Sequence, residues 1–222
     1  MPSQLVLPLG ARNAMARADF IAGPGNEAAL AFIDSWPDWP VAAAVLHGPP
    51  GAGKTHLVSA WRERAHAGIV SASALENIER DKPLAIEDVD SSAATASRDS
   101  ILFALIEGAA RDRPVLLTGR EPPASWPVTL PDLASRFSAI LSFALWAPDE
   151  GLLADLARKL FADRQLTVPE PVIRRMIVSL ERSPGAIRAF VAEADAKALS
   201  EGRPVNLSLV RDMLETRDGG LP

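Results

Sequence analysis

Short apolar runs alternate with amphipathic stretches along the first two thirds of the chain. Five runs have the length of a single strand, and the first of them, residues 41–46, is apolar throughout, which is typical of a strand buried on both faces of a parallel sheet. The predicted strands are residues 41–46, 68–70, 84–86, 115–117 and 140–143. Helical spacing of apolar residues predicts helices over 26–36, 54–65 and 97–111, the last with Ile101, Leu102, Leu105 and Ile106 on one face. Strands that alternate with helices indicate a doubly wound α/β sheet.

From about residue 148 the pattern changes to helices alone. The predicted helices are residues 149–164, 171–180, 184–199 and 206–217. Ser183 before Pro184, and Asn206, are suitable N-cap residues for the last two. We therefore expect an extended arm over 1–18, an α/β domain over 19–147 and a small all-helical domain over 148–222.

Composition and charge exclude several classes of protein. The chain has no cysteine, which excludes disulfides and thiolate metal sites. Its net charge of −5 argues against a protein that mainly coats nucleic acid, because that affinity comes from clustered Lys and Arg. The sequence lacks an apolar run of the roughly 18 residues that a membrane span requires, and it lacks signal-peptide features. We expect a soluble, cytoplasmic protein without a membrane partner.

The segment between the first predicted strand and the following helix has the pattern G-x-x-x-x-G-K-T of a phosphate-binding loop. Glycines let the backbone curl so that several N–H groups point at one phosphate, and the helix N-terminus adds favourable potential. Lys54 is expected to neutralise the β and γ phosphates, and the Thr55 hydroxyl to bind Mg²⁺. The alternative is a structural glycine turn, but the motif and its context both match a site for ADP or ATP. The predicted nucleotide-binding residues are Gly48, Pro49, Pro50, Gly51, Ala52, Gly53, Lys54, Thr55 and His56.

A run of acidic residues follows the predicted strand at 84–86. In phosphate-loop enzymes an Asp usually comes first and faces the metal, whereas here Glu87 stands at that position and Asp88 at the position of the water-orienting acid. We predict that Glu87 binds Mg²⁺ and that Glu87 and Asp88 are the catalytic acids. Because in-line attack depends on exact positioning, the exchanged order predicts slow intrinsic hydrolysis. The alternative is a solvated strand end that includes Asp90.

With these motifs the chain resembles the DnaA branch of AAA+ proteins, and most closely the Hda family, which acts in regulatory inactivation of DnaA. The resemblance runs almost end to end and implies an AAA+ core followed by a helical lid. Residues 19–23, followed by Asn26, are similar to the stretch that encloses the adenine base, which implies that Phe20, Ile21 and Asn26 contact nucleotide. The alternative for Phe20 and Ile21 is a place in the hydrophobic core.

Two further segments resemble the sensor motifs of this branch. Residues 183–188 are similar to the sensor-2 helix, which implies that Arg188 leans over the nucleotide; otherwise Arg188 is an ordinary helix-face charge. Residues 116–123 correspond to sensor 1, with Thr118 as the neutral polar candidate for that role. Arg120 stands where the initiator has an acidic residue, which again argues against fast hydrolysis.

Residues 130–137, LPDLASRF, are similar to the segment that presents the arginine finger. The resemblance implies that Arg136 is inserted in trans into the ATP site of a neighbouring subunit. There a guanidinium neutralises charge that develops on the γ phosphate, an effect worth roughly 10³ to 10⁵ in rate. Without the resemblance, Arg136 would be a solvated surface group.

Residues 4–9, QLVLPL, resemble the short peptide with which Hda proteins bind the β subunit of the DNA polymerase, the sliding clamp. The implied clamp-binding residues are Gln4, Leu5, Leu7, Pro8 and Leu9. In such peptides leucines fill an apolar pocket, proline limits the unbound conformers, and the glutamine amide makes hydrogen bonds. The alternative is that these leucines pack back onto the domain.

The resemblance implies a nucleotide-binding regulator of chromosome replication initiation at the nucleoid or replisome. Bound to the clamp, it would stimulate hydrolysis of DnaA-bound ATP and so prevent over-initiation. No helix-turn-helix domain follows the lid, so we expect no direct, sequence-specific DNA binding. One alternative is an autonomous ATPase such as a helicase loader or another replication remodelling factor. A second is an adaptor that does not use nucleotide, which the intact phosphate loop disfavours. Homo-oligomer formation is left open.

Overall fold

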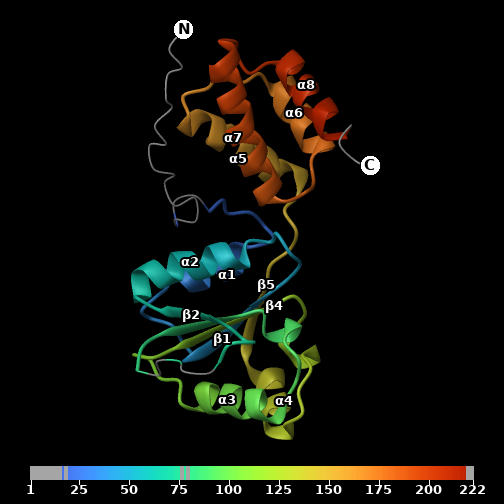
Figure 1. Cartoon of the computed structure of the whole chain (residues 1–222). Helices are drawn as coiled ribbons and strands as arrows, with labels where there is room; N and C mark the ends of the chain where they lie inside the picture. Colours follow the sequence, from blue (N-terminus) through green and yellow to red (C-terminus); the bar gives the residue numbers. More distant parts are fainter. Residues whose placement is uncertain (1–16, 18–19, 76–77, 79–80, 219–222) are drawn as a thin grey trace, which may run out of the picture.

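A parallel sheet with helices on both faces and a separate group of helices make up the protein (Figure 1). The computed structural model describes residues 17, 20–75, 78 and 81–218. The predicted α/β fold class is confirmed. The predicted arm over residues 1–18, including the clamp-binding residues at 4–9, lies outside the described residues apart from Arg17.

The sheet has five parallel strands in the order β2-β3-β4-β1-β5. Side chains of β1 alternate between two cores, because Ala44 and Leu46 pack on one face of the sheet and Val45 on the other. This burial on both faces explains why the run is apolar throughout. The strands, each of which overlaps a predicted one, are β1 (Ala43–His47), β2 (Gly68–Ser71), β3 (Leu84–Glu87), β4 (Val115–Gly119) and β5 (Leu141–Ala144).

Helices cover both faces of the sheet (Figure 1). α1 (Glu27–Asp34) and α2 (Lys54–Ala65) lie on one face, and α3 (Ala96–Glu107) and α4 (Pro131–Ala139) lie on the other. Two 3-10 turns, η2 (Val89–Ser91) and η3 (Pro123–Ser125), follow β3 and β4.

The predicted bounds of α2 are confirmed at both ends. For α3 the predicted end at residue 111 is wrong, because the helix stops at Glu107 with Gly108 as its C-cap. Ala110 then pairs with Arg113 in an isolated β-bridge. The predicted inner face of α3 does pack on the core, where Leu102 and Leu105 are buried.

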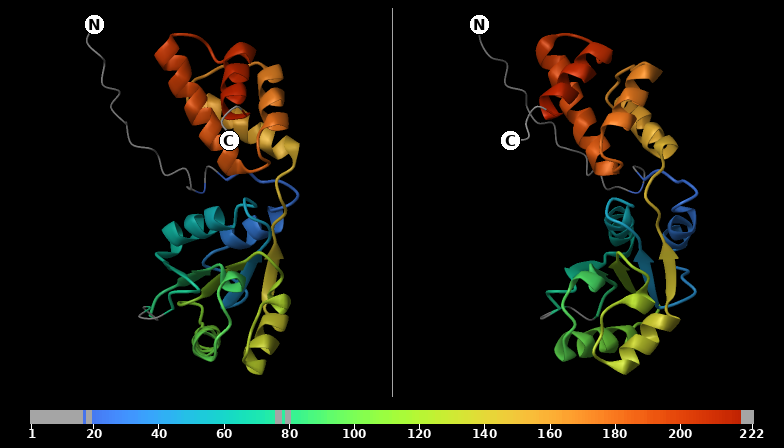
Figure 2. Two further views of the ribbon diagram at one scale, coloured as in Figure 1. Left: turned by 45° about the vertical axis from the view of Figure 1, so that its right-hand side comes forward. Right: turned by 90° about the vertical axis from the view of Figure 1, so that its right-hand side faces the viewer.

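The remaining helices, α5 to α8, form a group on the side of the sheet where β5 ends (Figures 1 and 2). Their buried apolar residues form a hydrophobic cluster of their own. Ser183 accepts a hydrogen bond from the Ala186 N–H at 3.1 Å and Asn206 one from the Leu209 N–H at 3.0 Å, as expected of N-caps. The separate cluster supports our proposal of a domain boundary near residue 148. Their bounds are α5 (Glu150–Asp163), α6 (Glu170–Ser179), α7 (Pro184–Glu201) and α8 (Leu207–Asp218).

No helix within the described part of the chain is long and apolar enough to cross a membrane.

Candidate nucleotide-binding site

A cavity of about 300 Å³ lies where the phosphate loop faces helices α5 and α7. Its volume is in the range of sites for small ligands. Predicted site residues from four separate segments of the chain converge on it. Those that line the cavity are Phe20, Ile21, Asn26, Pro50, Gly51, Ala52, Gly53, Lys54, Thr55, His56, Asp88 and Arg188. Of the other predicted residues, Gly48, Pro49, Glu87, Thr118 and Arg136 do not line it.

Glycine is required at two positions of the loop. Gly48 has a φ of +149°, and a Cβ on it would lie 2.0 Å from the carbonyl oxygen of Leu145. Gly53, the N-cap of α2, has a φ of +102°, and a Cβ there would lie 2.9 Å from the Phe20 ring. These constraints bring the loop close to its neighbours. The first residues of α2 line the cavity, and the N–H groups at a helix N-terminus favour an anion.

Lys54 is the first residue of α2 and lies across the loop. Its Nζ donates hydrogen bonds to the carbonyl oxygens of Gly48 at 2.5 Å and Pro49 at 3.0 Å. Burial lowers the pKa of Lys54 below its ordinary value, although the nearby charges of Asp88 and Asp90 act in the opposite direction. A phosphate is a stronger acceptor than a carbonyl, so Lys54 can exchange these hydrogen bonds for hydrogen bonds to a phosphate that enters the cavity.

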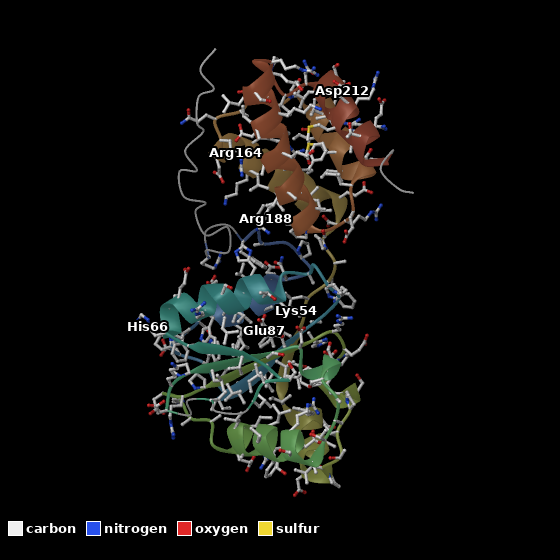
Figure 3. All side chains as sticks on the ribbon, in the orientation of Figure 1. Lys54, His66, Glu87, Arg164, Arg188 and Asp212 are labelled. Atoms are coloured by element: carbon white, nitrogen blue, oxygen red, sulfur yellow. The ribbon has the colours of Figure 1, made fainter. Side chains whose placement is uncertain are left out.

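Asp88, rather than Glu87, lines the cavity. Glu87 is the last residue of β3 and pairs with Ser71 of β2. Asp88 has a φ of +58°, and its N–H donates to the Thr118 hydroxyl at 3.2 Å. Thr118 is 1% exposed and does not line the cavity, and its hydroxyl fixes the turn after β3 by accepting this hydrogen bond. In the view of Figure 3, Lys54 at the start of α2 and Glu87 at the end of β3 both lie below Arg188 of α7.

Three cationic side chains, Lys54, Arg120 and Arg188, line the cavity, whereas Asp88 supplies the one carboxylate among its described lining residues. Arg120 comes from the loop after β4. The Asp90 carboxylate fixes that loop by accepting hydrogen bonds from the N–H groups of Arg120 at 2.6 Å and Glu121 at 3.0 Å. The excess of positive charge makes this part of the cavity suited to an anion.

Arg188 connects the helical group to the phosphate loop. It lies near the start of α7, on the end of the helix that faces α2 (Figure 3). Its Nη2 lies 3.3 Å from Nδ1 of His56, a buried residue of α2. The His56 ring in turn contacts the Phe20 ring edge-on, with centroids 5.2 Å apart. A movement of α7 would therefore change the contact between Arg188 and His56 beside the phosphate loop.

Asn26 shapes the segment that closes one side of the cavity. Its side chain accepts a hydrogen bond from the Gly23 N–H at 2.9 Å and donates one to the Ile21 carbonyl at 3.1 Å. Ile21 packs against the hydrophobic cluster of the helical group. Ile21 therefore lines the cavity and also packs on a core, whereas its contact with a nucleotide base stays a prediction.

Arg136 lies outside the cavity. It is on α4, on the face of the sheet opposite α1 and α2 (Figure 1), and its side chain is 52% exposed. Its Nε is 2.7 Å from a carboxylate oxygen of Glu107, at the end of α3. From this position Arg136 is presented to solvent and not to the cavity of its own chain.

The sequence reasoning missed the apolar part of the cavity. These residues are Trp146, Pro148, Leu152, Leu153 and Leu156. They follow β5 and belong to the connection and to α5, and the sequence analysis placed the leucines only within a predicted helix over residues 149–164. One signal was available, since Trp146 follows the carboxyl end of a parallel strand, the edge where ligands bind in such sheets.

Comparisons with solved structures agree on the fold. Domain III of the replication initiation protein DnaA from Thermotoga maritima superposes with a TM-score of 0.76, at 19% identity over 92% of this chain and 97% of that chain. AMPPCP-bound DnaA from Aquifex aeolicus gives a TM-score of 0.73, at 16% identity over 83% of this chain and 66% of that chain. RuvB from Thermotoga maritima, a Holliday junction branch migration motor, gives 0.69, at 16% identity over 91% and 72%.

No protein-family model matches the sequence. No curated protein matches it either. At the identities above, structural similarity establishes the fold: the chain has the AAA+ fold that is also found in DnaA domain III and RuvB.

Proposed function

We propose that this protein is a nucleotide-binding regulator of chromosome replication initiation. It holds ADP or ATP in the cavity between the phosphate loop and the helical group. Bound to the sliding clamp through residues 4–9, it inserts Arg136 into the ATP site of a neighbouring DnaA, whose ATP is then hydrolysed.

The observation that carries this proposal is the separation of the two functional elements. The cavity has the cations and backbone donors that phosphates need, while the predicted finger, Arg136, lies exposed on α4 and away from that cavity. An arginine so placed cannot serve its own chain's nucleotide but is available to a second molecule. The shared fold with DnaA domain III supports a head-to-tail pairing of two similar domains, which is a heterologous interface.

The same cavity can hold magnesium only when phosphate oxygens of a bound nucleotide also coordinate the ion. Among the described residues no three His, Asp, Glu or Cys side chains gather to hold a metal ion by themselves. Mg²⁺ keeps several waters and binds through one or two protein groups plus substrate phosphates. Thr55 and Asp88 line the cavity and would hold the ion there, whereas Glu87, the magnesium ligand expected from the sequence, does not line it. The ion would supply neutralisation of the phosphate charge.

The second candidate function is an autonomous ATPase that acts as a remodelling factor. One observation favours it, because Asp88 lines the cavity alongside Lys54 and Thr55. Arg120 in the same wall argues for a site that retains nucleotide tightly. ATP hydrolysis by the isolated protein distinguishes the two functions, because an autonomous ATPase requires it and the proposed regulator does not.

The experiment measures ATP hydrolysis by DnaA of the same organism, with clamp loaded on DNA, in the presence of this protein or its Arg136→Ala variant. The proposal predicts stimulation by the wild type that is lost in the variant, by roughly 10³-fold or more if the finger acts at full strength. Arg113→Ala is the matched control, because Arg113 is also an exposed arginine beside a carboxylate, with 45% side-chain exposure. Equal stimulation by wild type and Arg136→Ala would refute the proposal.

A further inference from the structure

Trp146 differs from the other tryptophans of the chain. Trp39, Trp61 and Trp126 are buried, and the rings of Trp36, Trp39 and Trp61 contact one another. Trp146, in contrast, is 67% exposed and lines the cavity. A large aromatic side chain that is left this exposed contributes little to the core, so its use has to be sought at the cavity.

The backbone holds Trp146 firmly in this place. Its N–H donates to the carbonyl of Gly25 at 3.0 Å, and the preceding Leu145, itself buried, donates to the His47 carbonyl at 2.7 Å. A Cβ added to Gly25 would lie 3.0 Å from Cβ of Trp146, so a larger residue at position 25 would crowd Trp146. The indole is thus presented from a fixed position, with most of its surface uncovered.

The cavity wall has two kinds of surface. Lys54, Arg120 and Arg188 give it positive charge, whereas Trp146 stands with Leu152 and other apolar side chains. A ligand that fits both has an anionic group joined to a flat apolar ring, which is the chemistry of a nucleotide. Aromatic side chains bind bases by stacking, and this contact tolerates any base with a π-face but strengthens with stacking area.

We propose that the Trp146 indole stacks on the base of the nucleotide in this cavity and gives the site its preference for purines over pyrimidines. This inference rests on the nucleotide site of the proposed function. Trp146 is a specificity-determining residue of that site, while the phosphates are held by the loop and its cations.

The test is a calorimetric titration of the whole 222-residue chain with ADP and, separately, with CDP. The wild type is expected to bind ADP more tightly than CDP. Trp146→Ala should weaken ADP binding by about tenfold or more, because the loss of one base–aromatic stacking contact changes a dissociation constant by roughly that factor. The effect on CDP should be smaller. Trp146→Phe keeps an aromatic face and should retain most of the affinity. The matched control is Trp36→Phe, in the ring cluster with Trp39 and Trp61, which should leave binding unchanged.

Intrinsic fluorescence gives a second readout. ADP should change the emission of the wild type and of Trp36→Phe but not that of Trp146→Phe. Unchanged ADP affinity in Trp146→Ala, in a protein that does bind ADP, would overturn the role of Trp146 and leave the nucleotide site intact. Failure of the wild type to bind ADP at all would overturn the nucleotide site, and the role of Trp146 with it.

Discussion

Replacing Asp99 by Asn is expected to destabilise the α/β part of the protein. Asp99 forms an ion pair with Arg98 at 2.8 Å, and the two side chains are 0% and 6% exposed. The other carboxylate oxygen accepts hydrogen bonds from the N–H and hydroxyl of Thr129 and from the N–H of Leu130. These bonds hold the segment that leads into α4, the helix of Arg136. An Asn side chain has only one acceptor oxygen, so its NH₂ group would face either the Arg98 guanidinium or the donors of Thr129 and Leu130.

The expected loss is about 3 kcal/mol in the free energy of unfolding. Breaking a buried ion pair by neutralising one partner costs about 3–5 kcal/mol, because the other charge stays buried without compensation. Asn has nearly the shape of Asp and leaves no cavity, which puts the effect at the lower end. In the double variant Arg98→Met, Asp99→Asn the uncompensated charge is gone, so the loss should be smaller than the sum of the two single losses.

Urea unfolding followed by tryptophan fluorescence measures this loss in the relevant part of the protein. All five tryptophans precede residue 147, and three of them are buried in the α/β part, so the signal reports mainly this part. Asp112→Asn is the control, since the Asp112 side chain is 81% exposed and its loss should change stability by less than about 0.5 kcal/mol. A loss below about 1 kcal/mol for Asp99→Asn, or additivity with Arg98→Met, would show that this ion pair does not stabilise the fold as described.

The remaining predictions concern acid stability and the finger. Burial by itself would raise the pKa of Asp99, but hydrogen bonds from Thr129 and Leu130 and the charge of Arg98 together lower it. A lowered folded-state pKa means that this contribution is present above the unfolded value of about 3.9 and is lost as pH falls through the folded value. Stability measured from pH 7 downward should therefore fall less steeply below about pH 4 in Asp99→Asn than in the wild type, and identical slopes would contradict this. Glu107→Gln removes the partner of the Arg136 side chain. Because an exposed pair is worth at most about 1 kcal/mol, it should raise stimulation of DnaA at limiting protein by no more than about fivefold; reduced stimulation would show that Glu107 helps to position the finger.

The phosphate loop and the sheet could be predicted because their signals are local. The helix over residues 54–65 is bounded by Gly53 at one end and by a change of pattern at the other, and both bounds are confirmed. Strands buried on both faces are apolar throughout, so β1 stands out without any knowledge of its neighbours. The predicted end of α3 was wrong because the helical spacing of apolar residues continues beyond Glu107. In the structure the residues that follow form a turn closed by the β-bridge between Ala110 and Arg113.

Contacts between distant segments could not be predicted from one sequence. Asp99 and Thr129 are 30 positions apart, and nothing in the local pattern of α3 marks an aspartate that is fully buried. The same holds for Trp146, whose place in the cavity depends on the approach of Gly25. The order of Glu87 and Asp88 was visible, but the left-handed turn that brings Asp88 to the cavity was not.

Nucleotide binding by the cavity is the claim on which the other proposals depend. The most direct measurement is calorimetric titration with ADP of the wild type, of Lys54→Ala and of Arg62→Ala, which removes an exposed charge from the same helix, α2. We expect one ADP bound per chain and no change of affinity in Arg62→Ala. In Lys54→Ala the affinity should be at least about tenfold weaker, because charge-assisted hydrogen bonds to phosphate are lost. Absence of binding to the wild type, or equal affinity in Lys54→Ala, would contradict nucleotide binding by this cavity.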